Sequence, residues 1–236
     1  MSPGQRVPVE FVLMSLLAIA ATAVALWMDL APWITGQPQD SAVWRFARTV
    51  LCALAAVAIV RQPLDRNSRW LLPLAMALAV VADYFLILGP DLVRGIAVFA
   101  MMQVALIVRH LLGIRRSALQ LRSVRVSIAC GVLVLGVGNG LLWPALSAKG
   151  LAVPVLIYSA LLIFSVVAAR VAGLVGALPR PQAAFALWGM VLFLLCDITV
   201  GIGAAVGHTA EGQLVRALTG LFYTPSLLLL VRSGTR

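Results

Sequence analysis

The stretch Trp70–Leu88, with the sequence WLLPLAMALAVVADYFLIL, is apolar apart from a single acid, Asp83. About 20 apolar residues in an α-helix cross the hydrocarbon core of a bilayer, so a run of this length is typical of a transmembrane helix. A strand of a membrane barrel would alternate apolar and polar residues, which this stretch does not do. The sequence here predicts a membrane-spanning helix with a carboxyl group inside the membrane.

The chain contains seven further apolar segments of similar length, and the connections between the segments are short. With 62% hydrophobic and 11% charged residues, the 236-residue chain has too little polar surface to cover a soluble globule. We therefore expect an all-α, polytopic membrane protein with eight transmembrane helices in one bundle, forming a single domain over residues 1–236. The seven segments are Val9–Trp27, Trp44–Val60, Val93–Leu112, Val126–Leu146, Leu151–Val171, Phe185–Val206 and Leu214–Val231.

The arginines are distributed unevenly between the two ends of these segments. Because one set of ends carries most of them, the positive-inside rule predicts that these ends and both chain termini are cytoplasmic. We expect the membrane to be the cell (inner) membrane. The formal charge of +10 does not point to nucleic acid, because the arginines do not follow one continuous face. The arginines of that side are Arg6, Arg61, Arg66, Arg69, Arg109, Arg115, Arg116, Arg122, Arg125, Arg170, Arg180, Arg232 and Arg236.

Two acids lie inside predicted helices rather than at their ends. Asp83 and Asp197 each follow the start of their segment by a similar number of residues, which places both at one level in the membrane. An ionisable group there costs at least about 2.5–3.5 kcal/mol, so both are candidate catalytic residues. The alternative is a protonated Asp that makes one hydrogen bond between helices.

Four polar side chains are expected near the level of these carboxyl groups. Counting along the other helices at a constant rise per residue places them in the same half of the membrane, where we expect them to bind substrate. A lone Tyr or Asn, however, is more often a hydrogen-bonding partner between helices than a ligand. The four residues are Gln103, Asn139, Tyr158 and Tyr223.

Several other chemistries lack the residues that they need. The one lysine, Lys149, falls in a loop, which argues against a Schiff base within the membrane. His110 and His208 fall at opposite membrane faces and the three cysteines show no paired spacing, so we expect neither a metal nor an organic cofactor. The glycine-rich run Gly136–Gly140 lies within a predicted helix and is interpreted as a close-packing surface.

Two carboxyl groups with Tyr, Gln and Asn around them in an apolar cavity suit acid/base hydrolysis of a lipid. Apolar surroundings favour the protonated form of a carboxyl group, which can then act as a general acid while its ionised partner orients a water molecule. The same carboxyl groups would also serve a small proton-coupled transporter or a lipid-binding membrane protein, which is the alternative from another class.

A resemblance to a known family begins at Ala82–Leu86 (ADYFL), which is followed by Gly95–Phe99 (GIAVF) and Gln103. The pattern resembles the lysoplasmalogenase (YhhN-type) membrane family, in which a GDxxL segment precedes GxxxFxxxH. Three later segments are similar, in order, to the PVxxYS, LFxxSD and YYxAQ segments of that family: Val153–Ser159, Leu192–Asp197 and Phe222–Ser226.

The resemblance implies a hydrolase that cleaves the vinyl ether of lysoplasmalogens and releases a fatty aldehyde. It makes Asp83 and Asp197 the matched acids, with Asp83 as the expected proton donor and Tyr158 and Tyr223 lining the site. The partner is then a lysophospholipid-like membrane lipid, and no cofactor is implied.

The chain departs from the family pattern at Gln103, which replaces a His able to transfer protons near neutral pH. A non-catalytic member of the family is therefore a further alternative.

Three other departures accompany the change at Gln103. Ala82 replaces the Gly before the first acid, and Ser226 replaces the Gln of the last segment. The chain has no clear Lys-Pro at the start of the second apolar segment, where Arg48 is the nearest cation.

Overall fold

The computed structural model describes residues 7–35, 40–59, 64, 66–89, 91–112, 114, 121–206 and 210–235. Within these ranges the chain forms eight helices that are long and apolar enough to cross a membrane, and no strand. The predicted all-α, eight-helix membrane fold is therefore confirmed. The helices are α1 (Val9–Thr35), α2 (Ala42–Ile59), α3 (Arg66–Asp83), α4 (Leu92–Leu111), α5 (Arg122–Ala148), α6 (Ala152–Leu174), α7 (Arg180–Val206) and α8 (Ala210–Arg232), with a short π-helix, η1 (Tyr84–Leu88), directly after α3.

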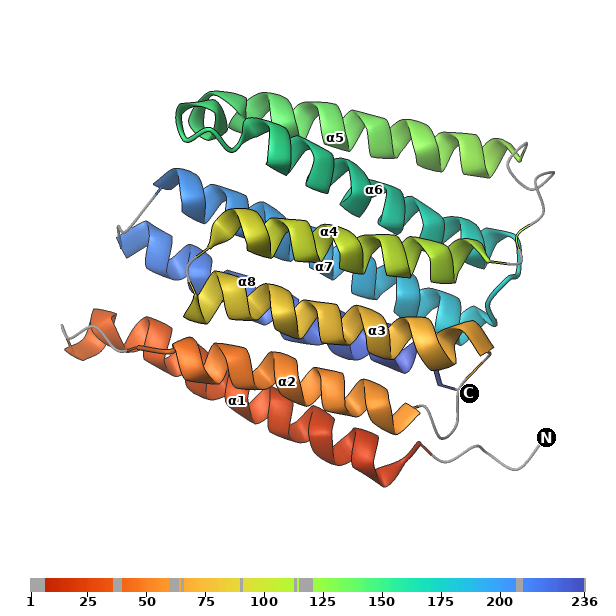
Figure 1. Cartoon of the computed structure of the whole chain (residues 1–236), viewed down its shortest axis with the longest axis horizontal. Helices are drawn as coiled ribbons and strands as arrows, with labels where there is room; N and C mark the ends of the chain where they lie inside the picture. Colours follow the sequence, from red (N-terminus) through yellow and green to blue (C-terminus); the bar gives the residue numbers. More distant parts are fainter. Residues whose placement is uncertain are drawn as a thin grey trace.

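Successive helices run in opposite directions, so α1 begins and α8 ends at the same end of the bundle (Figure 1). We call this the arginine-rich end and the other the distal end. Assignment of the arginine-rich end to the cytoplasm stays a prediction from the positive-inside rule. The described arginines at helix ends there are Arg69, Arg109, Arg122, Arg125, Arg170, Arg180 and Arg232.

The centre of the bundle is built around α8. This helix packs most extensively against α7 and also contacts α1, α2 and α3, while α4 packs against both α3 and α6. Small side chains are frequent in the buried faces of α2 and α3, where Ala55, Ala56, Ala75 and Ala79 are fully buried. Alanines allow helices to approach closely in a membrane. The end of α3 is thereby held close to α2 and α8.

Helix α5 lies at the edge of the bundle, where it packs against α6 and to a smaller extent α7 (Figure 1). Only Val124 and Leu146 of this helix are buried. The interpretation of Gly136–Gly140 as a close-packing surface is wrong within this chain, because nothing lies within 4 Å of a Cβ built at any of its three glycines. The close contact occurs instead at Gly131, which faces side chains of α6.

Helix α1 extends beyond its predicted end at Trp27 and includes Pro32, which the sequence had placed in a connection. Proline has no N–H, so Pro32 removes the bond that Met28 would otherwise accept. Because Pro32 lies in the last turn of α1, only this one bond is lost and the helix continues to Thr35. The first connection at the distal end is correspondingly shorter than expected.

The helical path changes immediately after Asp83. In η1 the backbone N–H of Gly89 donates to the carbonyl of Tyr84 at 2.8 Å, five residues earlier, which is the π-helical pattern. Such wide turns are rare and often lie at functional sites. The apolar pattern of Trp70–Leu88 predicted one uninterrupted helix, so η1 is a feature that the sequence did not reveal.

Candidate active site

Asp83 is the last residue of α3 and has an exposed fraction of only 5%. Its Oδ2 atom accepts a hydrogen bond of 2.5 Å from the hydroxyl of Thr49 on α2. The guanidinium of Arg48 on α2 and the hydroxyl of Tyr223 on α8 also interact electrostatically with this carboxyl group. Asp83 is thus surrounded by polar groups from two neighbouring helices.

Asp197 lies on α7, and its Oδ2 atom accepts a hydrogen bond from the hydroxyl of Tyr158 on α6. The carboxyl groups of Asp197 and Asp83 are close enough to interact electrostatically with each other. The structure therefore brings together the two acids that the sequence placed at one level. Five helices, α2, α3, α6, α7 and α8, contribute to this cluster, with Thr49 and Arg48 as the side chains from α2.

Arg48 supplies a positive charge to the cluster. Its side chain is buried, and its Cζ lies 5.3 Å from the centroid of the Tyr223 ring. A Cβ built at Gly220 of α8 would lie 2.7 Å from Arg48 Nη1, so this glycine makes room for the guanidinium. Among the described residues Arg48 forms no ion pair within 4.0 Å, and its Nε atom has no hydrogen-bond partner.

Aromatic rings pack against the two tyrosines of the cluster and form an apolar wall beside it. Phe99 of α4 contacts Phe193 of α7, Tyr158 and Tyr223, with ring centroids 5.7–6.4 Å apart. Phe193 also contacts Tyr223, at 5.8 Å. The electron-rich faces of such rings stabilise nearby positive charge. The surroundings therefore suit an apolar chain and a cationic intermediate.

Gln103 lies one helical turn after Phe99 on α4 and is completely buried. Neither its Nε2 nor its Oε1 atom has a hydrogen-bond partner among the described residues. The hydroxyl of Tyr223 is also buried and lies beside the carboxyl group of Asp83. Buried polar atoms are costly when unpaired, so the amide of Gln103 is available to a bound polar molecule.

Asn139 is not brought into contact with either carboxyl group. Its Nδ2 donates to Ser159 Oγ of α6 at 2.9 Å and to the carbonyl of Leu135 at 3.0 Å, and Ser159 Oγ donates to its Oδ1 at 3.2 Å. The side chain therefore joins α5 to α6, which is the alternative that the sequence left open for a lone Asn.

Sequence reasoning missed Thr49 and Arg48 as members of the site. Both lie within the second apolar segment, but Arg48 was interpreted only as a cation near a helix start. The available signal was that Arg48 and Thr49 each lie about one helical turn before Cys52, so the three share one face of the helix. In the described part of the chain no three His, Cys, Asp or Glu side chains gather as a group that could hold a metal ion.

Comparison with known proteins identifies the family. The model of the YhhN family matches residues 41–234, from the start of α2 to the end of α8. No curated protein and no solved structure matches the chain. The matched region contains both acids and all four polar residues predicted for the site. Since the match covers most of the chain, this protein is a member of the YhhN family, as its motifs predicted.

Proposed function

We propose that this protein hydrolyses the vinyl-ether bond of lysoplasmalogen-like lipids and releases a fatty aldehyde. The observation that carries the proposal is the cluster in which Asp83, buried, and Asp197, partly buried, interact, with aromatic rings and a buried cation around them. Membership of the YhhN family supports it, because the lysoplasmalogenase resemblance lies in the same motifs. The substrate is a single-chain ether lipid drawn from the membrane.

The reaction begins with transfer of a proton to the vinyl carbon that is not bound to oxygen. The electron pair of the double bond forms the new C–H bond and leaves an oxocarbenium ion on the ether side. Water adds to this cation as it loses a proton to a carboxylate, giving a hemiacetal. The hemiacetal collapses to the aldehyde while its hydroxyl proton moves to the departing glycerol oxygen. General acid catalysis of this type typically contributes about 10²–10⁴-fold.

The surroundings of the two acids favour Asp197 as the proton donor, whereas the sequence had favoured Asp83. Asp83 has the positive charge of Arg48 and the hydroxyl of Thr49 beside it, and both stabilise a carboxylate. A negative Asp83 in turn opposes a second negative charge on Asp197. In this assignment Asp83 accepts the proton from water, and that proton returns to Asp197 to complete the cycle.

A non-catalytic member of the family is the second candidate. Gln103 occupies the position of the family's His, and an amide cannot exchange protons near neutral pH as imidazole does. In this alternative the unpaired amide of Gln103 serves to bind a lipid rather than to assist its hydrolysis.

The experiment is to give lysoplasmenylethanolamine to the purified protein in detergent and to measure aldehyde release. We expect turnover by the wild type, and unchanged turnover by the control Asp91→Asn, because Asn caps a helix as well as Asp does. Turnover that appears only in Gln103→His would favour the non-catalytic alternative. If neither protein releases aldehyde while the wild type carries a proton-coupled solute flux, the hydrolase proposal is replaced by the transporter.

A further inference from the structure

A cavity of about 300 Å³ opens at the distal end of the bundle, away from the arginine-rich end. Its walls come from α1, α2, η1 and α8, together with the residues just before α2. The polar residues that line it are Asp29, Asp40, Ser41, Arg45 and Arg216. None of these belongs to the cluster around the two catalytic carboxyl groups.

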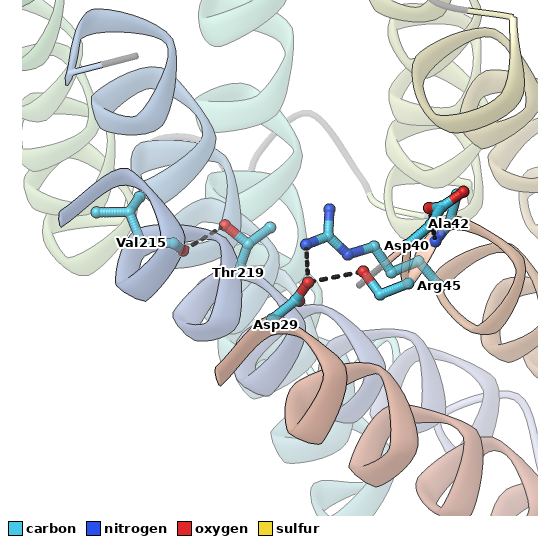
Figure 2. A network of polar contacts seen from close by, with 7 residues as sticks. Asp29, Asp40, Ala42, Arg45, Val215 and Thr219 are labelled. Atoms are coloured by element: carbon cyan, nitrogen blue, oxygen red, sulfur yellow. Dashed lines mark hydrogen bonds and ion pairs between the residues drawn. The ribbon is translucent and has the colours of Figure 1, made fainter. Parts of the chain in front are cut away.

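The floor of the cavity holds a preformed ion pair. Asp29 Oδ1 accepts 2.5 Å and 2.6 Å hydrogen bonds from Arg45 Nη2 and from the hydroxyl of Ser41 (Figure 2). The exposed fraction of the side chain is 10% for Asp29 and 22% for Arg45, so both are largely sheltered from solvent. A charged pair held in this way is rigid enough to orient a polar ligand.

Two further charges of opposite sign line the cavity without forming an ion pair with the described residues. Arg216 of α8 makes no hydrogen bond or ion pair with the described part of the chain. Asp40 accepts one hydrogen bond, of 2.9 Å, from the backbone N–H of Ala42 (Figure 2). The cavity thus presents two cations and two anions, with one of each sign available for a ligand.

This balance of charge fits one class of headgroup. An anionic ligand would favour an excess of arginine, and a cationic ligand an excess of acid. A phosphate joined to an ammonium group satisfies Arg216 and Asp40 together. Arginine is also well suited to phosphate oxygens, which it can bind through two N–H groups at once.

The cavity lies near the candidate active site along two elements. Arg45 precedes Arg48 and Thr49 by one turn of α2, and Leu86, which lines the cavity, follows Asp83 by three residues. One turn corresponds to about 5 Å. A glycerol unit of similar length separates the phosphate of a lysophospholipid from its ether oxygen, so a lipid held here would place its ether near Asp83.

We propose that this cavity binds the zwitterionic headgroup of the substrate, with Arg45 and Arg216 on the phosphate and Asp40 on the ammonium group. The proposal rests on the proposed hydrolase function, because it places the vinyl ether of the same lipid at the carboxyl pair. Arg216 and Asp40 are then the residues that determine headgroup specificity, and the lipid enters from the distal end.

The test is equilibrium binding of a saturated 1-O-alkyl lysophosphoethanolamine to the full chain in detergent, because this lipid has the headgroup but no vinyl bond to cleave. We expect Arg216→Gln to weaken binding about tenfold or more, the scale of one lost charge-assisted hydrogen bond. The control Arg94→Gln removes an arginine near the same end that is 71% exposed, and should bind as the wild type does.

Headgroup selectivity is tested with the matching alkyl lysophosphatidate, which has the phosphate but no ammonium group. Asp40→Asn should shift the preference severalfold from the ethanolamine lipid toward lysophosphatidate, because it removes the partner of the ammonium group. Wild-type affinity and preference in both Arg216→Gln and Asp40→Asn would overturn the assignment, as would the absence of binding to the wild type.

The binding measurement also separates this proposal from the hydrolase proposal. Wild-type protein that binds the saturated lipid but releases no aldehyde from the vinyl ether contradicts the hydrolase alone. Wild-type protein that hydrolyses the vinyl ether, while Arg216→Gln keeps full affinity for the saturated lipid, contradicts the headgroup site alone.

Discussion

Arg48 makes the surroundings of Asp83 different from those of Asp197. Its guanidinium is buried, interacts with Asp83 and lies over the ring of Tyr223. Taking a charge out of water is expensive, and among the described residues no carboxylate lies within ion-pair distance to compensate fully. A cation retained under these conditions points to a role in the chemistry of Asp83.

We predict that Arg48→Gln lowers aldehyde release by about tenfold or more, because Asp83 loses the positive charge that stabilises its carboxylate. Gln is shorter than Arg but stays polar and adds no bulk, so the helices should still assemble. Steady-state rates measured beside Arg94→Gln, an exposed arginine, would check this. Equal rates in the two variants would show that the Arg48 charge has no part in turnover.

At the scale of elements, the contact between α2 and α8 depends on a glycine. A Cβ at Gly220 would meet Arg48 Nη1 at 2.7 Å, a distance that forces the guanidinium to move. We predict that Gly220→Ala reduces aldehyde release severalfold or more without removing any charge. The measurement is kcat together with the thermal unfolding midpoint.

The matched control for this substitution is Gly136→Ala on α5, where nothing lies within 4 Å of the added Cβ. Alanine in a helix is more favourable than glycine by roughly 0.5–1 kcal/mol, so this variant should be active and at least as stable as the wild type. Full activity in Gly220→Ala would contradict the placement of Arg48 against α8.

Most helices could be predicted from the sequence because each apolar run reaches the length that a membrane demands. The π turn after Asp83 could not, since a wide turn is selected by packing around Leu86 and its neighbours rather than by local composition. The continuation of α1 past Pro32 was also missed, because a proline in a last turn removes only one hydrogen bond.

The site was only partly predictable, for a geometric reason. A constant rise per residue places Asp83 and Asp197 at one depth, but depth does not say which way a side chain faces. The partnership of Thr49 with Asp83 depends on which helices are neighbours and on their rotation. Asn139 joins α5 to α6 rather than contacting the acids, because the position of α5 at the edge of the bundle follows from helix order, which composition does not reveal.

At the scale of the whole molecule, the arginine distribution predicts the orientation of the bundle. Reporter fusions after Arg180 should read as cytoplasmic, and fusions after Lys149 as external, because positively charged connections remain on the cytoplasmic side. The measurement is the activity of a reporter that works on one side of the membrane only. An external signal after Arg180 would reverse the orientation and place the headgroup cavity in the cytoplasm.

The central claim, that Asp83 and Asp197 act as one catalytic unit, is tested most directly by aldehyde release from Asp83→Asn, Asp197→Asn and the double variant. Asn keeps the shape and much of the hydrogen bonding of each side chain but supplies no acidic proton. We predict a loss of roughly 10²-fold or more in each single variant, and little further loss in the double variant, because residues that act together are not additive. Wild-type turnover in both single variants, or losses that multiply in the double variant, would contradict the account.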